Sequence, residues 1–225
     1  MKIGILQTGH APDELRPVVG DINNLFERLL SGQGFTFDTY AVVDGIFPDG
    51  PDVCDGWLIT GSKHGAYEDL PWIKTLEHLI REIYADGVPL VGVCFGHQII
   101  AQALGGKVEK FEGGWAVGRQ TYDWDGETVS LNAWHQDPVV ERPTDATPIA
   151  CNDFCENAAL VYGDKVFTLQ AHPEFESQFI QGLIKARAGT VPPELIETAK
   201  ANLGADTDNL RLAAQISAFF KGASA

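Results

Sequence analysis

The chain has 225 residues, of which 44% are hydrophobic, so it is long enough to build one sizeable core. Its 31 acidic residues outnumber the 16 Lys and Arg, and the net charge of −15 is spread along the chain. Such a surface repels phosphate backbones and anionic lipids, which argues against nucleic-acid and membrane partners. The first ten residues lack the apolar run of a secretory signal, and no apolar stretch approaches the roughly 18 residues that cross a bilayer. We therefore expect a cytoplasmic protein.

The first half of the chain alternates between strand-like and helix-like segments. Short runs rich in aromatic and β-branched residues predict strands at 2–7, 35–42, 56–60 and 89–93. Apolar residues at helical spacing predict helices at 21–34, 70–87 and 95–106. Asp21 is a candidate N-cap of the first helix, and Pro71 suits the first turn of the second. This order predicts the α/β class, with a mostly parallel central sheet flanked by helices.

The pattern changes from about residue 107 onward. Segment 108–134 predicts antiparallel strands joined by Gly-Gly and Asp-Gly turns, which would form an additional small antiparallel sheet. Segment 165–170 predicts one more core strand, and helices are predicted at 177–189, 192–203 and 207–222. We expect a single domain over 1–225, in which 188–225 is a helical C-terminal extension.

Four cysteines in a chain of this length do not suggest a disulfide framework. Cys151 and Cys155 form a CxxxC pattern without a second pair, and no histidine lies at ligand spacing. We expect packing thiols at these two positions, and neither a metal site nor a cofactor. Cys54 stands alone in the sequence, whereas Cys94 has an informative context.

Cys94 is the central residue of the stretch GVCFG, residues 92–96, which joins a predicted strand to a predicted helix. In the G-x-nucleophile-x-G form, a sharp turn lifts the central side chain clear of the sheet, and glycines avoid a clash. The N–H of Phe95 would point to where an oxyanion forms. We therefore expect Cys94 to be a nucleophile. The alternative is a small apolar residue buried in a strand.

A cysteine nucleophile normally needs a base, and the sequence has six histidines. Three of them have no supporting pattern and are expected to be surface residues: His10, His64 and His78. His97 comes one helical turn after Cys94, so we expect it to pack beside the turn. His135 and His172 remain as candidates.

His172 follows the predicted strand 165–170 and precedes Pro173 and Glu174. In a parallel sheet the end of this strand lies at the same edge as Cys94, where such sheets bind ligands. His172 would polarise the thiol, while Glu174 would fix its tautomer and stabilise the imidazolium. The alternative is a hydrogen-bonded histidine at a strand end, without a catalytic role.

Two motifs together, GVCFGHQIIAQALGG at 92–106 and LQAHPEF at 169–175, resemble the signature of the class I glutamine amidotransferase family. The resemblance covers about residues 2–187. It implies an α/β domain in which Cys94 attacks a γ-glutamyl amide, releases ammonia or an amine, and forms a γ-glutamyl thioester that water cleaves. It also implies that His172 is general base and then acid, that Glu174 orients it, and that Gln98 contacts the glutamyl group.

The family's second oxyanion donor comes from a glycine loop after an early strand, often Gly-Gly-Pro. The matching segment, 59–73, has Gly61 after Thr60 and lacks Gly-Gly-Pro. This departure resembles a stand-alone branch that is similar to GMP synthase glutaminase domains and plant γ-glutamyl peptidases. It implies that the backbone N–H of Gly61 is the donor.

The segment AWHQDPV, residues 133–139, resembles the family's Ser-His-x-Asp segment, with Trp134 in the place of the serine. The resemblance implies that Trp134, His135 and Asp137 line the glutamyl end of the pocket, where Asp137 would meet an α-ammonium group. The alternative is that these residues only close a turn.

Three functions remain open for this chain. It could hydrolyse a small γ-glutamyl compound on its own, or supply ammonia as a glutaminase to a separate synthase, or act as a catalytically silent binding or regulatory module. The sequence has no P-loop and leaves no room for an ATP-dependent acceptor domain, and its Cys, His and Glu set argues against a silent module. We favour the stand-alone hydrolase.

Overall fold

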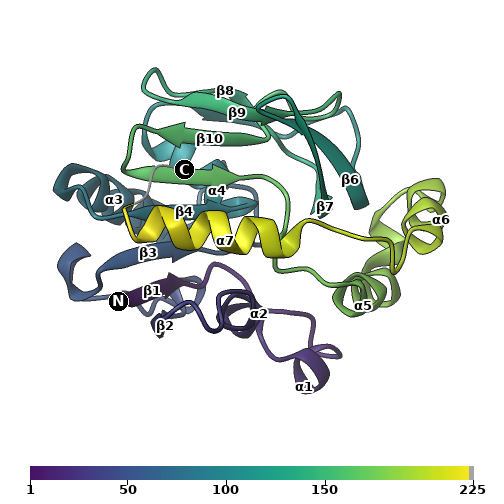
Figure 1. Cartoon of the computed structure of the whole chain (residues 1–225), viewed down its shortest axis with the longest axis horizontal. Helices are drawn as coiled ribbons and strands as arrows, with labels where there is room; N and C mark the ends of the chain where they lie inside the picture. The colour runs from purple at the N-terminus through teal and green to yellow at the C-terminus, as the bar shows by residue number, and fades with distance from the viewer. Residues whose placement is uncertain (223–225) are drawn as a thin grey trace.

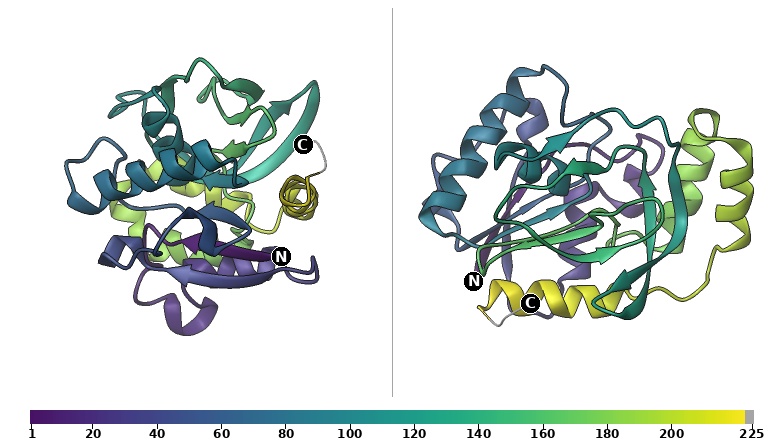
Figure 2. Two further views of the ribbon diagram at one scale, coloured as in Figure 1. Left: turned by 90° about the vertical axis from the view of Figure 1, so that its left-hand side faces the viewer. Right: turned by 90° about the horizontal axis from the view of Figure 1, so that it is seen from above.

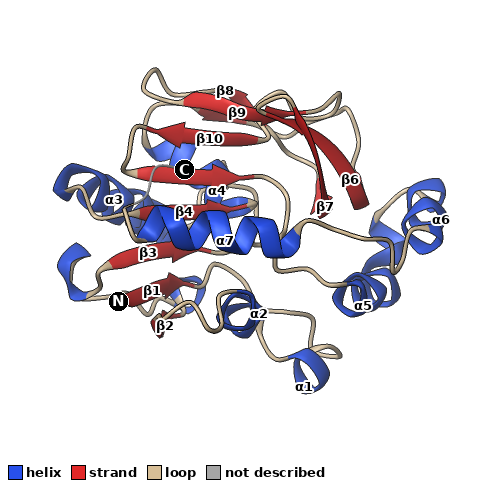
Figure 3. Cartoon of the chain, viewed as in Figure 1, coloured by secondary structure: helices blue, strands red, loops and turns tan. Residues whose placement is uncertain are grey.

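The strands of the computed structural model, which describes residues 1–222, form a nine-stranded sheet in the order β2-β1-β3-β4-β11-β10-β9-β6-β7 (Figures 1 and 3). The first five strands in this order are parallel: β2 Thr36–Tyr40, β1 Lys2–Leu6, β3 Gly56–Ile59, β4 Leu90–Val93 and β11 Val166–Leu169. The other four continue the sheet in antiparallel pairing: β10 Ala159–Tyr162, β9 Thr147–Cys151, β6 Ala116–Trp124 and β7 Glu127–His135. A separate antiparallel sheet pairs β5 Lys107–Val108 with β8 Val139–Glu141. The predicted α/β class is confirmed, but most of the expected antiparallel strands extend the main sheet.

Helices cover both faces of the parallel part of this sheet. Their bounds are α1 Arg16–Val19, α2 Ile22–Leu29, α3 Pro71–Asp86, α4 Phe95–Ala103, α5 Ser177–Arg187, α6 Pro193–Ala201 and α7 Asn209–Phe220. Three 3-10 turns lie at Val42–Asp44, Pro51–Val53 and Ala188–Thr190. The end-on view of Figure 2 shows α7 on one side of the sheet and α3 on the other. The helices on the two faces therefore enclose two separate apolar layers.

The central strands contribute alternate side chains to the two apolar layers. Leu58 and Val91 pack into the cluster that contains residues of α2 and α7, whereas Trp57 and Leu90 pack into the cluster that contains residues of α3 and α4. Successive side chains of a strand point to opposite faces, so a strand that is covered on both faces is apolar throughout. This is why 56–59 and 89–93 are continuous apolar runs in the sequence.

The helix boundaries follow the signals in the sequence. The Asp21 side chain accepts a hydrogen bond from Ile22 N–H and forms a capping box with Asn24, so the predicted N-cap of α2 is confirmed. Pro71 lies in the first turn of α3, as expected. The four-residue helix α1 was not predicted, because so short a segment carries no helical periodicity.

The C-terminal helix α7 packs on the main sheet. The Phe219 ring lies 6.0 Å from the ring of Phe167 on β11, and Leu212 and Ile216 have no exposed surface. Residues 223–225 of the predicted C-terminal extension lie outside the described residues. Within residues 1–222, no helix has both the length and the apolar character needed to cross a membrane.

Candidate active site

Cys94 occupies the turn between β4 and α4 in a strained backbone conformation. Its φ is 55° and its ψ is −104°, and Asp125 is the one other non-glycine residue with positive φ in the described part of the chain. A positive φ is costly for a residue with a Cβ, and it persists only where the surrounding structure imposes it. The turn therefore has the strained geometry of a nucleophile elbow.

The two glycines that flank Cys94 are required by close backbone contacts. A Cβ on Gly92 would lie 2.6 Å from the carbonyl oxygen of Gly96, and a Cβ on Gly96 would collide with the carbonyl oxygen of Ile59. Real Cβ atoms essentially never approach another atom so closely. The glycine spacing in GVCFG is thus explained by the tight packing of α4 against β3 and β4.

His172 and Glu174 form a buried pair next to the elbow. β11 is parallel to β4, so the chain that follows β11 emerges at the same sheet edge as Cys94. The Nδ1 atom of His172 lies 2.7 Å from Oε1 of Glu174, and the two side chains are 4% and 0% exposed. The ring of Phe175 stacks on the imidazole at 3.8 Å. With Nδ1 engaged by the carboxylate, Nε2 is the nitrogen available to the thiol.

The surroundings of His172 favour its protonated form. Burial lowers the pKa of His172, but the charge of Glu174, the nearby Cys94 sulfur and the hydrogen bond to Glu174 outweigh burial and raise it to about 10. The imidazolium is thus stabilised by a carboxylate on one side and by sulfur on the other. This is the charge arrangement that a cysteine nucleophile and its base require.

The loop after β3 brings Gly61 against both residues. A Cβ on Gly61 would lie 2.9 Å from Cε1 of His172 and 3.7 Å from the Cβ of Cys94. Neither the Gly61 N–H nor the Phe95 N–H donates a hydrogen bond to another group within residues 1–222. Two free N–H groups beside a nucleophile are what an oxyanion hole needs.

This loop is fixed by hydrogen bonds from the same chain. The Gly96 N–H donates to the Thr60 carbonyl at 3.1 Å. The Thr8 hydroxyl lies 2.9 Å from the Thr60 carbonyl oxygen and 3.1 Å from the Gly61 carbonyl oxygen. Because these carbonyls face Thr8 and Gly96, the orientation of the Gly61 peptide is set before any ligand binds.

One pocket contains Cys94, His172, Glu174, Gly61 and Trp134 in its wall. The structure therefore brings together the three expected catalytic residues, one expected oxyanion donor and one of the expected substrate-binding residues. Gln98, His135 and Asp137 are not part of this wall. The functional roles of all these residues remain predictions.

The three residues outside the wall make contacts elsewhere. The Gln98 amide donates to the Asp137 carbonyl and, at 3.2 Å, to the side chain of Gln170. The Asp137 carboxylate accepts hydrogen bonds of 3.0 Å from the Tyr67 hydroxyl and the Phe111 N–H. These contacts link the start of α4 to the segment after β7.

Two further histidines are buried and uncharged. Burial lowers the pKa of His97 to about 3, and its Nδ1 lies 2.8 Å from the Thr168 hydroxyl. Burial and the nearby His172 and His97 lower the pKa of His135 to about 3, and neither of its ring nitrogens has a hydrogen-bond partner within residues 1–222. His97 therefore packs beside the elbow, as expected from the sequence.

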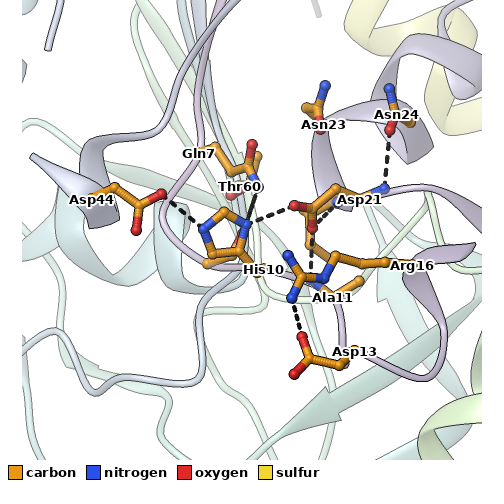
Figure 4. A network of polar contacts seen from close by, with 12 residues as sticks. Gln7, His10, Ala11, Asp13, Arg16, Asp21, Asn23, Asn24, Asp44 and Thr60 are labelled. Atoms are coloured by element: carbon orange, nitrogen blue, oxygen red, sulfur yellow. Dashed lines mark hydrogen bonds and ion pairs between the residues drawn. The ribbon is translucent and has the colours of Figure 1, made fainter. Parts of the chain in front are cut away.

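His10 differs from the expectation of an ordinary surface residue. It is half-buried, lines the pocket of Cys94, and lies between two carboxylates (Figure 4). Its Nδ1 is 2.6 Å from Asp21 and its Nε2 is 3.0 Å from Asp44. Pairing with Asp21 is the largest cause that raises the pKa of His10 above 6.5. The neighbouring Gly9 contacts Gly61 and Ser62 of the loop after β3. The hydrogen bonds of His10 with the two aspartates therefore anchor one wall of the pocket.

Two other basic residues of the pocket wall, Lys63 and Arg187, were not singled out from the sequence. Arg187 ends α5, and the wall also includes Phe179 and Leu183 of that helix. Phe179, Leu183 and Arg187 follow one another at intervals of four residues, and this spacing indicates in the sequence that they share one face of the helix. The sequence does not reveal that this face turns toward Cys94.

Comparisons with known proteins agree with this geometry. The model of the glutamine amidotransferase class-I family matches residues 53–182, which include Cys94, His172 and Glu174. Gamma-glutamyl peptidase 4 of Arabidopsis thaliana is 32% identical over 202 residues, which cover 82% of this chain and 80% of that protein. The glutamine-hydrolyzing GMP synthase of Chlamydia caviae is 29% identical over 66% of this chain and 33% of its own length.

The fold has a close structural counterpart as well. A crystal structure of a glutamine amidotransferase from Methylobacillus flagellatus matches with a TM-score of 0.78 at 22% identity, over 100% of this chain and 95% of that one. This likeness supports the fold, while the family match and the peptidase relative support membership. The chain belongs to the class-I glutamine amidotransferase family and is an enzyme of that hydrolase type.

Proposed function

We propose that the chain hydrolyses the γ-glutamyl amide bond of a small γ-glutamyl compound through a thioester on Cys94, without a partner protein. The observation that carries this proposal is the single pocket that joins Cys94, the His172–Glu174 pair and the Gly61 loop. A nucleophile, an oriented base and oxyanion donors are the groups that acyl transfer requires.

The first half of the reaction forms the thioester. Nε2 of His172 holds the thiol proton while Sγ of Cys94 attacks the γ-carbonyl carbon, and the developing oxyanion accepts hydrogen bonds from the N–H groups of Gly61 and Phe95. As the tetrahedral intermediate collapses, the C–N bond breaks and the imidazolium gives its proton to the leaving nitrogen. Ammonia or an amine departs, and a γ-glutamyl thioester remains on Cys94.

The second half returns the enzyme to its starting state. A water molecule gives a proton to Nε2 of His172 as its oxygen attacks the thioester carbon. The C–S bond then breaks, Cys94 leaves as the thiolate paired with the imidazolium, and glutamate is released. Glu174 keeps Nδ1 of His172 occupied in both halves, so the same ring nitrogen acts as base and as acid.

Independence from a partner is supported by the oxyanion loop. The Thr60 and Gly61 carbonyls are held by Thr8 and by the Gly96 N–H, all within this chain. A preorganised donor needs no rearrangement at the moment of reaction, and this is the source of much electrostatic catalysis. These contacts within the chain support catalysis without a partner protein.

The similarity to Arabidopsis gamma-glutamyl peptidases supports a γ-glutamyl compound as the substrate. A second candidate is a glutaminase that delivers ammonia to a separate synthase, and the similarity to glutamine-hydrolyzing GMP synthases favours it. The two functions share the chemistry at Cys94 and differ in the leaving group and in the need for a partner.

Steady-state assays of the purified protein would separate these functions. Glutamate release is measured with glutamine and with a panel of γ-glutamyl amides and dipeptides, in the absence of nucleotide, metal and partner. We expect turnover of at least one compound by the native chain and by Cys151→Ala, which removes an exposed thiol, and none by Cys94→Ala. Inactivity toward the whole panel, with glutaminase activity restored by an added synthase, would support the second candidate.

A further inference from the structure

The pocket of Cys94 presents positive charge although the chain is strongly acidic, with 31 Asp and Glu against 16 Lys and Arg. Lys63 and Arg187 line it, and the other two basic residues of the wall, His10 and His172, are already paired with carboxylates. Glu174 is the one carboxylate of the described wall, and it is buried against His172. A ligand that enters the pocket therefore meets positive charge that no wall residue neutralises.

Arg187 is the more enclosed of the two cations, since its side chain is half-buried whereas Lys63 is exposed. Burial lowers the pKa of Arg187, and no carboxylate within residues 1–222 counteracts this effect. A guanidinium that loses hydration without an acidic partner is stabilised when an anion binds, and its planar donors suit a carboxylate. The chemistry of this position points to an anionic ligand group.

An apolar strip connects Arg187 to the catalytic histidine. Phe175 stacks on the ring of His172, and its own ring lies 4.4 Å from that of Phe179. Phe179, Leu183 and Arg187 follow at intervals of four residues along α5, so they share one helix face, and all of them line the pocket. The wall that begins at His172 is thus apolar first and cationic at its far end.

The chemistry determines which part of a substrate meets this wall. The leaving nitrogen has to lie next to Nε2 of His172, because that atom delivers the proton when the C–N bond breaks. The γ-carbonyl oxygen points instead to the N–H groups of Gly61 and Phe95. We infer that the substituent on the leaving nitrogen extends along the side of the pocket that Phe179, Leu183 and Arg187 form, because this wall is continuous with His172 through Phe175.

We propose that Arg187 is a specificity-determining residue that binds a carboxylate on the leaving group. The substrates are then γ-glutamyl amino acids or short γ-glutamyl peptides with a free carboxylate and an apolar side chain, in preference to glutamine. This inference rests on the proposed hydrolysis at Cys94 and names its substrate class.

The test compares γ-glutamyl-leucine with γ-glutamyl-leucinamide, which differ in the charge of one group, and includes glutamine. For the native enzyme we expect kcat/KM to be about 10- to 100-fold higher for the acid than for the amide, as for a lost charge-assisted hydrogen bond. Arg187→Gln should abolish this preference, because it raises KM for the acid much more than KM for the amide. Arg187→Lys should keep part of it, and Lys185→Gln, which removes a charge from the same helix outside the pocket wall, should keep all of it.

An equal loss for acid and amide in Arg187→Gln, or a native enzyme that treats them alike, would overturn the role of Arg187. Calorimetric binding to Cys94→Ala tests the inference apart from turnover. If Cys94→Ala binds the acid more tightly than the amide, and if adding Arg187→Gln to this variant abolishes the difference, the role of Arg187 is supported. This holds even if the native enzyme hydrolyses neither compound, because that inactivity would reject only the proposed function. Equal binding of the two compounds, or binding of neither, would contradict the role of Arg187.

Discussion

Leu169 of β11 is the parallel-paired neighbour of Val93 of β4, and the Cys94 N–H donates to the Leu169 carbonyl at 2.9 Å. Cys94 directly follows Val93, and His172 comes shortly after Leu169. This register brings two residues that are far apart in the sequence to one edge of the sheet. Cys94 and His172, the proposed nucleophile and base, are therefore positioned by backbone hydrogen bonds of the core.

A side chain at Gly61 should slow catalysis while the fold is kept. In Gly61→Ala the new Cβ would lie 2.9 Å from Cε1 of His172, so the imidazole or the loop has to move by several tenths of an ångström. A displacement of about 1 Å costs on the order of 100-fold in rate, so this smaller shift should cost roughly 10-fold. We expect that loss in kcat together with a small change in Tm. A variant with native kcat would show that the loop does not adjoin the reacting groups.

Two buried histidines should respond differently to replacement by alanine. His172→Ala should lower kcat by about three orders of magnitude or more, because it removes the base of the nucleophile. His97→Ala removes a hydrogen bond to Thr168 and leaves a cavity, so it should lower stability by about 2 kcal/mol and keep most of the activity. Measurement of kcat for both variants, after their folding has been verified, distinguishes the two roles. If His97→Ala were the inactive variant, the assignment of the base would be wrong.

The proton affinity of His172 should depend on Cys94. The pKa of His172 is raised from 6.5 to about 10 because the charge and hydrogen bond of Glu174 and the nearby Cys94 sulfur outweigh burial. This stabilisation of the fold is complete below pH 6.5 and is lost as the pH rises through about 10. In Cys94→Ala, NMR titration should show a markedly lower pKa for His172. An unchanged value would mean that the sulfur does not interact with the imidazole.

The pairing of His10 should make stability depend on pH. Its folded pKa is raised above 6.5, first by Asp21 and further by Asp44, so its contribution is present below pH 6.5 and is lost as the pH rises through the folded value. Asp44→Asn should therefore lower Tm below pH 6.5 and leave it unchanged at alkaline pH. Asp49→Asn, an exposed control, should have no effect at either pH. A Tm difference that does not change with pH would rule out the titration of His10 as its cause.

Much of the catalytic edge could be predicted because its signals are local. Gly92 is needed by a turn within one short segment, and the strand before His172 is mostly apolar because both of its faces are covered. The parallel-sheet rule then places both residues at one edge. The packing role of His97 also followed from its distance of one helical turn from Cys94.

Other features depend on contacts that the sequence does not encode locally. His10 looked like a surface residue because its partners, Asp21 and Asp44, become neighbours only in the folded chain. The turn at Asp125 and Gly126 predicts a hairpin, but it does not determine that β6 pairs with β9 and so joins the main sheet. The periodicity of α5 defines a face, yet the direction of that face is set by tertiary packing.

The proposed reaction passes through a thioester on Cys94, and acid quenching of the enzyme during turnover would trap this intermediate. Intact-mass measurement and peptide mapping would follow the addition of a γ-glutamyl substrate. We expect a mass increase of one γ-glutamyl group, confined to the peptide that contains Cys94 and absent from Cys94→Ala. Substrate turnover by Cys94→Ala, or a γ-glutamyl adduct on Cys54, Cys151 or Cys155 in place of Cys94, would contradict it.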